Sequence, residues 1–317
     1  MVGAGGAIIN YLFPGARGAP ESKGAENIVS MEDIRLEQGL HEECGVFGIY
    51  DPEGSCAQTT YYGLYALQHR GQEACGIAAI NDREQSFYKD VGLVSEVFDR
   101  ETLQRLNGTM AVGHVRYATT GAGARENAQP LTIKYVKGTL AVVHNGNLVD
   151  VDRLRARFEY QGAIFHTTSD TEVLLYAYCE WGEDCLTQFN GMWGFALWDG
   201  QENKLFCARD RLGAKPFHYW RQGNRIMFGS ELKQLCQDGA VQRRFDTSYL
   251  AANLIYHISD YNDQTLIEGM KTLRPGHKLV VQLGAGHNTI DSFTISSYWT
   301  LHVHYDNSKT EAERVRL

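Results

Sequence analysis

The sequence predicts an α+β fold, and three observations lead to this class. Hydrophobic residues make up 43% of the 317 positions, enough for a substantial core in one large domain or two small ones. The second half of the chain is rich in short strands separated by turn residues. Strands and helices do not alternate regularly, which disfavours a parallel, doubly wound sheet.

The first half of the chain is expected to mix buried strands with helices. Strands are expected over residues 44–50, 76–80, 87–88, 109–117 and 139–144, the last ending at the tight-turn pair Asn145-Gly146. Helices are expected over residues 61–69, 92–106, 150–160 and 170–180. Ser169 would be the N-cap of the last helix, with Glu172 placed to complete a capping box.

The second half is expected to contain mainly strands. These strands are expected over residues 194–199, 204–209, 217–220, 225–229 and 278–283, together with a helix over residues 246–255. No repeat of fixed period is present in the sequence.

Composition argues against several classes of protein. The formal net charge of −8, without a basic stripe, disfavours a nucleic-acid partner. No apolar run approaches the roughly 18 residues of a membrane span, and the N-terminus lacks the basic region of a secretory signal. The seven cysteines have scattered spacings without a CxxC pair, so we expect no zinc site, reduced thiols and a cytoplasmic location.

Residues 1–43 differ from the rest of the chain. Glycine and alanine dominate the first twenty positions, and a charged stretch follows up to Glu43. Such a segment is either a disordered tail or a removable leader. At Cys44 the pattern changes to a buried strand.

Cys44 is a candidate nucleophile. A cysteine on a strand is usually core filling. Cleavage before Cys44 would give its thiol a neighbouring α-amine with a pKa of about 7.7–8.0, against about 8.5 for the thiol. That amine would act as the general base without a catalytic histidine, whereas an internal Cys44 carries an amide that cannot accept the proton.

Three further segments carry residues suited to binding an amino acid. Arg116 is either a surface charge or a clamp for a carboxylate. The Asn145 amide and the Gly146 N–H form either a turn or an oxyanion hole. Asp170 either caps a helix or holds an ammonium group. Together these groups fit an amino acid with a side-chain amide, which is glutamine or asparagine.

These four segments together resemble the class II glutamine amidotransferases, the glutaminase family of N-terminal-nucleophile hydrolases. The resemblance runs from Glu42 to about Trp299. It implies a four-layer αββα fold, with two antiparallel sheets packed between helices. It also implies hydrolysis of L-glutamine to glutamate and ammonia through a thioester on the N-terminal cysteine.

The resemblance assigns a role to each matching residue. Cys44 would be the nucleophile, with Asn145 and Gly146 completing the catalytic set as the oxyanion hole. The substrate-binding residues would be Arg116 at the α-carboxylate with Thr119 and Thr120 nearby, Asp170 at the α-ammonium, and Arg70 in a motif close to the nucleophile.

Two families share this domain, and the chain resembles both. Residues 42–173 resemble amidophosphoribosyltransferase through the motifs at 43–48, 67–73, 113–121, 126–131 and 144–148. Residues 174–300 resemble glutamine-dependent asparagine synthetase through the motifs at 189–199, 208–216, 228–233, 273–277 and 298–299. The nucleophile of the asparagine synthetases normally follows the initial Met alone, whereas 43 residues precede Cys44.

The resemblance also predicts the domain organisation. Residues 1–43 would be a flexible propeptide, 44–300 the glutaminase domain and 301–317 a linker to an acceptor (synthase) domain that is absent from this chain. The sequence shows neither an acidic phosphoribosyl-diphosphate loop nor a Ser-Gly-Gly-Leu-Asp-Ser-type loop. No metal or cofactor is expected for glutamine hydrolysis, since Mg²⁺ would enter only with the acceptor domain. Homo-oligomerisation is left open.

Two other functions compete with an active glutaminase. The chain would be an inactive scaffold or regulatory module if the fold were kept without turnover. It would be another N-terminal-nucleophile amidase if it accepted acyl amides, but Arg116 and Asp170 fit the charged ends of a free amino acid. Three further features are expected to be structural: His144 in a turn, an ion network at 209–211, and Cys75 in the core.

Overall fold

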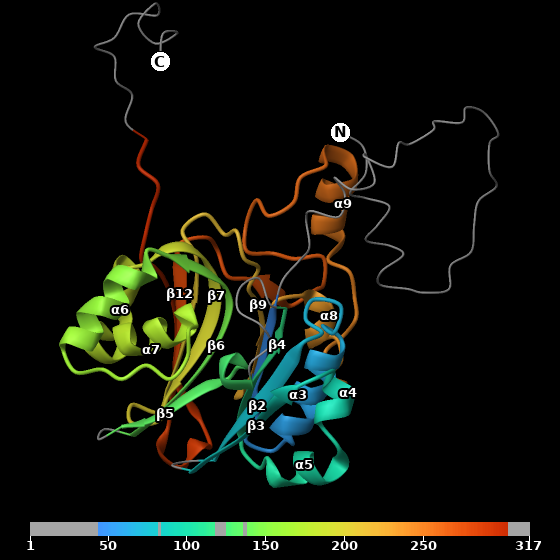
Figure 1. Cartoon of the computed structure of the whole chain (residues 1–317). Helices are drawn as coiled ribbons and strands as arrows, with labels where there is room; N and C mark the ends of the chain where they lie inside the picture. The colour runs from blue at the N-terminus through green and yellow to red at the C-terminus, as the bar shows by residue number, and fades with distance from the viewer. Residues whose placement is uncertain (1–43, 82–83, 118–124, 136–137, 304–317) are drawn as a thin grey trace, which may run out of the picture.

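Two antiparallel sheets packed face to face form the centre of the molecule, and helices cover both outer faces (Figure 1). The structure is a computed structural model that describes residues 44–81, 84–117, 125–135 and 138–303. The layers therefore run helix, sheet, sheet, helix. This arrangement confirms the predicted four-layer αββα fold.

The larger sheet has seven strands, and β1 lies in the middle of it. Every pairing in this sheet is antiparallel. In spatial order its strands are β11 (Met270–Thr272), β9 (His218–Gln222), β10 (Arg225–Gly229), β1 (Gly45–Tyr50), β4 (Met110–Arg116), β2 (Ala74–Asn81) and β3 (Glu84–Val91).

The second sheet has six strands, again all antiparallel. Its long strand β6 pairs with β7 from Leu140 to Val149 but with β5 only as far as Val142. In spatial order its strands are β13 (Ile290–Ser297), β12 (His277–Leu283), β8 (Lys204–Arg209), β7 (Asn190–Asp199), β6 (Gly138–Val149) and β5 (Leu131–Tyr135).

Helices cover the two sheets from opposite sides (Figure 1). The seven-stranded sheet contacts α3 (Cys56–Tyr65), α4 (Val94–Val97) and α8 (Leu232–Leu235). The six-stranded sheet contacts α7 (Asp170–Trp181), against which α6 (Val151–Tyr160) packs. Among the described residues, the remaining helices are α5 (Arg100–Arg105), α9 (Thr247–Tyr256), and the 3₁₀ turns η1 (Arg125–Asn127), η2 (Gly182–Thr187) and η3 (Ala285–His287).

Strand alternation divides the core into three apolar layers. On β1, Val46 faces the layer between the sheets, whereas Phe47 faces the layer beneath α3. On β6, Val143 faces the layer between the sheets, whereas Val142 faces α7. Because successive side chains point to opposite faces, a strand covered on both sides is apolar throughout. This explains the uniform burial of β1 that the sequence predicted.

The single helix predicted over residues 92–106 is wrong, because the chain forms two short helices there. Phe98 is extended and separates α4 from α5. Its ring is buried and packs edge to face on Tyr88, which draws the backbone toward the core. Asp99 then starts a new helix, since its side chain accepts a hydrogen bond of 2.7 Å from the Thr102 N–H.

The predicted turn at Asn145-Gly146 is also wrong, because β6 continues through this pair to Val149. Pairing with β7, in which Asn145 lies opposite Gly194 and Gly146 opposite Trp193, overrides the local turn preference. Ser169 is the N-cap of α7, as predicted. The capping box is not formed, because the Glu172 carboxylate accepts from the backbone of His166 and Thr167 instead.

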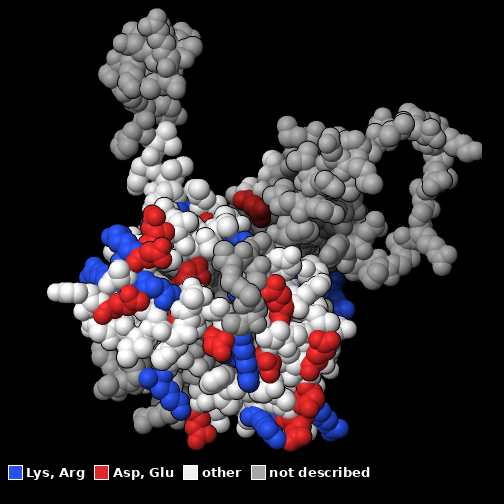
Figure 2. All heavy atoms as spheres, in the orientation of Figure 1, with Lys and Arg blue, Asp and Glu red and all other residues white. Residues whose placement is uncertain are grey.

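Most other predicted elements are present with shifted ends. The helix predicted over 61–69 spans Cys56–Tyr65, and the strand predicted at 87–88 spans Glu84–Val91. Strands β5, β11 and β13 and the short α8 were not predicted. On the face shown in Figure 2, acidic and basic side chains are interspersed. Within the described residues, no helix is long and apolar enough to cross a membrane.

Replacing Ile77 by alanine is expected to test the layer beneath α3. Ile77 is fully buried on β2, so Ile77→Ala should lower the free energy of unfolding by about 2–5 kcal/mol. Val91→Ala is the control, because Val91 lies half exposed on the edge strand β3 and should cost about 0.5 kcal/mol or less. Urea unfolding measures both, and equal losses would contradict the assigned layer.

Candidate active site

A pocket of about 420 Å³ lies where β1 begins and where β6, still paired with β7, is no longer paired with β5. Its volume is within the roughly 300–1,000 Å³ typical of small-molecule sites. Its lining includes Cys44, Arg116, Gln129, His144, Gly146 and Asp170.

The backbone of Cys44 is held by one arginine. The Cys44 N–H donates to the Arg70 carbonyl at 3.1 Å, and the Arg70 Nε donates to the Cys44 carbonyl at 2.9 Å. Between these bonds Cys44 adopts a φ of 60°, in the left-handed region that non-glycine residues seldom occupy. Its Sγ lies 3.6 Å from the Tyr117 carbonyl, at the wall of the pocket.

Arg70 is in turn held by a partly buried carboxylate, that of Glu231. Its Nη1 lies 3.0 Å from Glu231 Oε1, and His69 and Lys233 contact the same carboxylate at 3.0 and 3.1 Å. Burial raises the pKa of Glu231, but the hydrogen bond from Arg70 and the nearby charges outweigh burial and lower the pKa overall. Arg70 is 3% exposed, and its side chain contacts the Cys44 carbonyl and the Glu231 carboxylate. Its contact with substrate stays a prediction.

Gly146 presents its backbone to the pocket. Alternate N–H groups of a strand point to the same edge of that strand. Beyond Val142, the edge of β6 that faced β5 is no longer paired with it. On this edge the His144 N–H donates to Gln129 and the Leu148 N–H donates to Asp170. By the same alternation the Gly146 N–H is expected on this edge between them, and Gly146 lines the pocket. A Cβ on Gly146 would lie 2.1 Å from the Met192 carbonyl oxygen, so only glycine fits.

Asn145 lies behind Gly146, on the side of β6 that faces the other sheet. Its side chain is fully buried, and Nδ2 donates to Ser230 Oγ at 3.4 Å. Ser230 Oγ also accepts from the Val46 N–H at 3.0 Å, two residues after Cys44. Ser230 therefore connects the start of β1 with the predicted oxyanion hole on β6.

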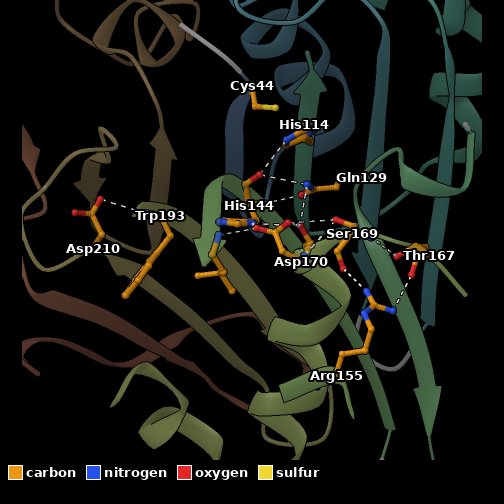
Figure 3. A network of polar contacts seen from close by, with 12 residues as sticks. Cys44, His114, Gln129, His144, Arg155, Thr167, Ser169, Asp170, Trp193 and Asp210 are labelled. Atoms are coloured by element: carbon orange, nitrogen blue, oxygen red, sulfur yellow. Dashed lines mark hydrogen bonds and ion pairs between the residues drawn. The ribbon is translucent and has the colours of Figure 1, made fainter. Parts of the chain in front are cut away.

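Asp170 is the first residue of α7 and lies at the opposite wall from β1 (Figure 3). Its Oδ2 accepts from the Leu148 N–H at 2.8 Å, which leaves Oδ1 directed at hydroxyl groups 3.5 Å away. The positive end of the helix dipole stabilises the negative charge at this position. Arg155 of α6 fixes the preceding loop through the carbonyls of Thr167 and Ser169.

His144 joins β6 to α7 beneath the pocket (Figure 3). Its Nδ1 lies 3.1 Å from Thr171 Oγ1 and 3.9 Å from Asp170 Oδ2. Burial lowers the pKa of His144, although Asp170 opposes this shift. Burial also lowers the pKa of His114 to about 3, so the neutral His114 ring donates through Nε2 to the His144 carbonyl at 3.1 Å.

Arg116 ends β4 on another side of the pocket. Its side chain is 11% exposed and lines the pocket, and its Nη1 lies 4.0 Å from the Glu73 carboxylate. A mostly buried guanidinium that lines a pocket is suited to a carboxylate ligand. Thr119 and Thr120, predicted to lie nearby, are outside the described residues.

The structure brings most of the predicted site residues together. Cys44, Arg116, Gly146 and Asp170 line one pocket, whereas Asn145 and Arg70 lie directly behind it. Sequence reasoning missed Gln129, His144 and Ser230 as members of the site. All three belong to motifs on which the family resemblance rested, and this was the available signal.

The three features expected to be structural have different outcomes. His144 is not in a turn but in β6, because the strand continues past it. The segment at 209–211 is structural through hydrogen bonds to backbone groups rather than through an ion network: Arg209 donates to three carbonyls, and Asp210 accepts from backbone N–H groups. Cys75 is buried in the core, as predicted.

Comparison with known proteins identifies the family. The model of the glutamine amidotransferase domain matches residues 99–299, more than half of the chain. The chain therefore belongs to the glutamine amidotransferase domain family, in agreement with the fold and the pocket.

Its relatives include named enzymes. The chain is 41% identical to the amidophosphoribosyltransferase of Bacillus subtilis over 203 residues, which cover 61% of this chain and 42% of the relative. It is 36% identical to that of Methanocaldococcus jannaschii over 241 residues, 69% of this chain and 50% of the relative. The chain thus spans about half the length of these relatives.

A solved structure shows the same fold. The chain is similar to the glutamine phosphoribosylpyrophosphate amidotransferase of B. subtilis complexed with ADP and GMP, with a TM-score of 0.63 and 30% identity. The match covers 81% of this chain and 50% of the solved chain. The resemblance of residues 174–300 to asparagine synthetase stays a prediction.

Three histidines shielded from solvent, of which His114 and His144 are buried and His218 is partly buried, are expected to make stability depend on pH. Burial lowers the pKa of His114 to about 3 and that of His218 to about 4, and lowers that of His144 as well. Below about pH 6.5 the unfolded chain therefore binds more protons than the folded chain. The free energy of unfolding should fall between pH 6.5 and 5, by up to about 1.4 kcal/mol per pH unit for each histidine.

Urea unfolding across this range measures the slope. His114→Asn should make the slope shallower, whereas His302→Asn, at an exposed position, should leave it unchanged. A stability that is constant from pH 6.5 to 5 would contradict the neutral, buried state of these rings.

Proposed function

We propose that this chain hydrolyses L-glutamine to L-glutamate and ammonia, with Cys44 as the nucleophile. The observation that carries the proposal is the shared pocket: Cys44 lines it together with a cation, Arg116, and an anion, Asp170. These two charges complement the carboxylate and ammonium of a free amino acid. The Gly146 N–H, also at the pocket, supplies a donor for an oxyanion.

Activation of the thiol requires cleavage after Glu43. The Cys44 nitrogen is an amide in the intact chain, and it donates to the Arg70 carbonyl. Once residues 1–43 are removed, the same nitrogen is an amine that takes the proton from Sγ. Residues 1–43 lie outside the described residues, so the propeptide is part of the proposal.

The thiolate attacks the side-chain carbonyl carbon of glutamine. The carbon–oxygen double bond becomes an oxyanion, which the Gly146 N–H and the Asn145 amide stabilise. The oxygen and nitrogen of an asparagine amide can exchange places by a turn of the amide group. With Asn145 turned in this way, the Ser230 hydroxyl donates to Oδ1, and Nδ2 is available to donate to this oxyanion. The carbon–nitrogen bond then breaks, and the nitrogen leaves as ammonia with the proton held by the α-amine.

Water completes the reaction. It adds to the thioester with the α-amine as general base, the carbon–sulfur bond breaks, and glutamate and the free thiol are released. Each step moves only protons and electron pairs among substrate, water and Cys44. No metal or cofactor is therefore part of the proposed glutaminase reaction, and Mg²⁺ belongs to the proposed acceptor domain.

We assign the ammonia to an acceptor domain of the amidophosphoribosyltransferase type, acting in purine biosynthesis. Two observations support this proposal. The relatives are named amidophosphoribosyltransferases, and the chain matches about half of each, so the other half of each relative has room for an acceptor domain. Asparagine synthesis is the second candidate, and it rests on the motifs at 189–199, 208–216, 228–233, 273–277 and 298–299. The linker at 301–317, self-association and the cytoplasmic location stay predictions.

Glutaminase activity should depend on Cys44 and on the removal of residues 1–43. Chain beginning at Cys44 should release glutamate from glutamine, and Cys44→Ala should lower the rate by about 10³-fold or more. Cys179→Ala, at an exposed cysteine, should keep the rate. Glutamate is measured directly, and the N-terminus is checked by intact mass. Activity that persists with the leader attached would refute the amine mechanism, and glutamine binding without turnover would favour an inactive scaffold.

Removing the charge of Asp170 should weaken glutamine binding. Asp170→Asn keeps an oxygen for the Leu148 N–H but loses the negative charge that faces the ammonium. A charge-assisted hydrogen bond contributes ~1.5–3 kcal/mol, so kcat/KM should fall roughly 10- to 100-fold, mainly through KM. Asp152→Asn on the exposed surface of α6 is the control. If the unmodified enzyme hydrolyses an N-acylated glutamine as fast as it hydrolyses glutamine, it is an acyl amidase instead.

A further inference from the structure

Strand β6 loses its neighbour β5 at the point where the site begins. The register pairs Leu131 with Val142, and two residues further along it Gln129 and His144 would be opposite each other. No backbone pairing between these two residues is formed. The side-chain amide of Gln129 takes its place: Oε1 accepts from the His144 N–H at 2.7 Å, and Nε2 donates to the His144 carbonyl at 3.2 Å.

The Gln129 amide is fully used and well buried. Its Nε2 also donates to Thr171 Oγ1 on α7 at 3.2 Å, and the residue is only 6% exposed. One acceptor and two donors are needed at this position, and among side chains of this size only a primary amide supplies them. A buried network in which every group is satisfied holds its members in one arrangement.

Because the Gln129 side chain takes the place of a continued strand β5, there is room for the pocket. A continued β5 would cover the edge of β6 at residues 144–148, where Gly146 lines the pocket. Instead, the His144 N–H on this edge donates to Gln129, and the Leu148 N–H donates to Asp170. Gly146 lies between them on the same edge, with β7 pairing on the other side.

We infer that Gln129 is a positioning residue of the glutaminase site, which replaces the missing strand partner of His144 and so fixes the oxyanion-binding Asn145–Gly146 segment relative to α7. This inference rests on the proposed function, and it assigns Gln129 no contact with the reacting atoms. An oxyanion donor acts mainly in the transition state, because the charge develops there. Misplacing this segment should therefore lower kcat more than it changes KM.

The test compares the Gln129→Glu variant with the unmodified enzyme, both beginning at Cys44. The carboxylate has the shape of the amide and accepts from the His144 N–H, but it cannot donate to the His144 carbonyl or to Thr171. We expect kcat for glutamine to fall about 10- to 100-fold, with KM changed less than about threefold. Gln188→Glu, at an exposed glutamine, is the matched control and should change neither.

Two further measurements separate positioning from general damage. Iodoacetamide alkylates the Cys44 thiolate without forming an oxyanion, so its rate should be the same in Gln129→Glu and the unmodified enzyme. The double variant Gln129→Glu/Asn145→Ala should lower kcat by a factor smaller than the product of the two single-variant factors, because both residues act through one oxyanion hole. Gln129→Met, which keeps the shape without polar atoms, repeats the comparison if Gln129→Glu does not fold.

Each result decides the inference. An unchanged kcat in Gln129→Glu, or a loss matched by slower alkylation, overturns it, as does failure of both variants to fold. If the unmodified enzyme has no glutaminase activity, the proposed function fails as well. An active enzyme with an unaffected Gln129→Glu variant overturns only the role of Gln129.

Discussion

Every polar group of the site depends on the apolar layer between the two sheets. Val46 of β1 and Val143 of β6 both belong to this layer and are fully buried. A shift of either strand by one residue would turn its apolar side chains to the wrong face, so the register of both strands is fixed. Cys44, directly before β1, and Gly146, near the end of β6, therefore keep their positions at the pocket without a direct bond between them.

The sequence was sufficient to predict those parts of the site that lie at the ends of strongly patterned elements. Cys44 precedes a strand of six apolar or small residues, Arg116 ends another strand, and Asp170 follows a good N-cap. Periodicity and capping locate such ends because both are local properties of the chain. The antiparallel four-layer architecture was harder to predict. Its prediction came from the family resemblance rather than from the pattern of strands.

The parts that could not be predicted depend on partners distant in sequence. Asn145-Gly146 has the composition of a turn, but pairing with β7 keeps it in a strand. Phe98 interrupts a helical pattern because its ring is buried against Tyr88. The hydrogen bonds of Gln129 to His144 join residues that only the folded register brings together. Local propensity is a weak guide wherever tertiary packing competes with it.

A common constraint explains why these unpredicted residues gather around the pocket. A pocket at strand ends leaves backbone N–H and carbonyl groups without strand partners, and such buried groups must be satisfied. Here side chains satisfy them. The pairs are Arg70 with the Cys44 carbonyl, Ser230 with the Val46 N–H, Gln129 with His144, and Asp170 with the Leu148 N–H. Arg70 also contacts Cys44 itself, Ser230 contacts Asn145, and Asp170 belongs to the proposed substrate-binding set. Gln129 acts one residue away, on His144 next to Asn145. Opening the pocket and positioning its reactive groups are therefore the same structural problem.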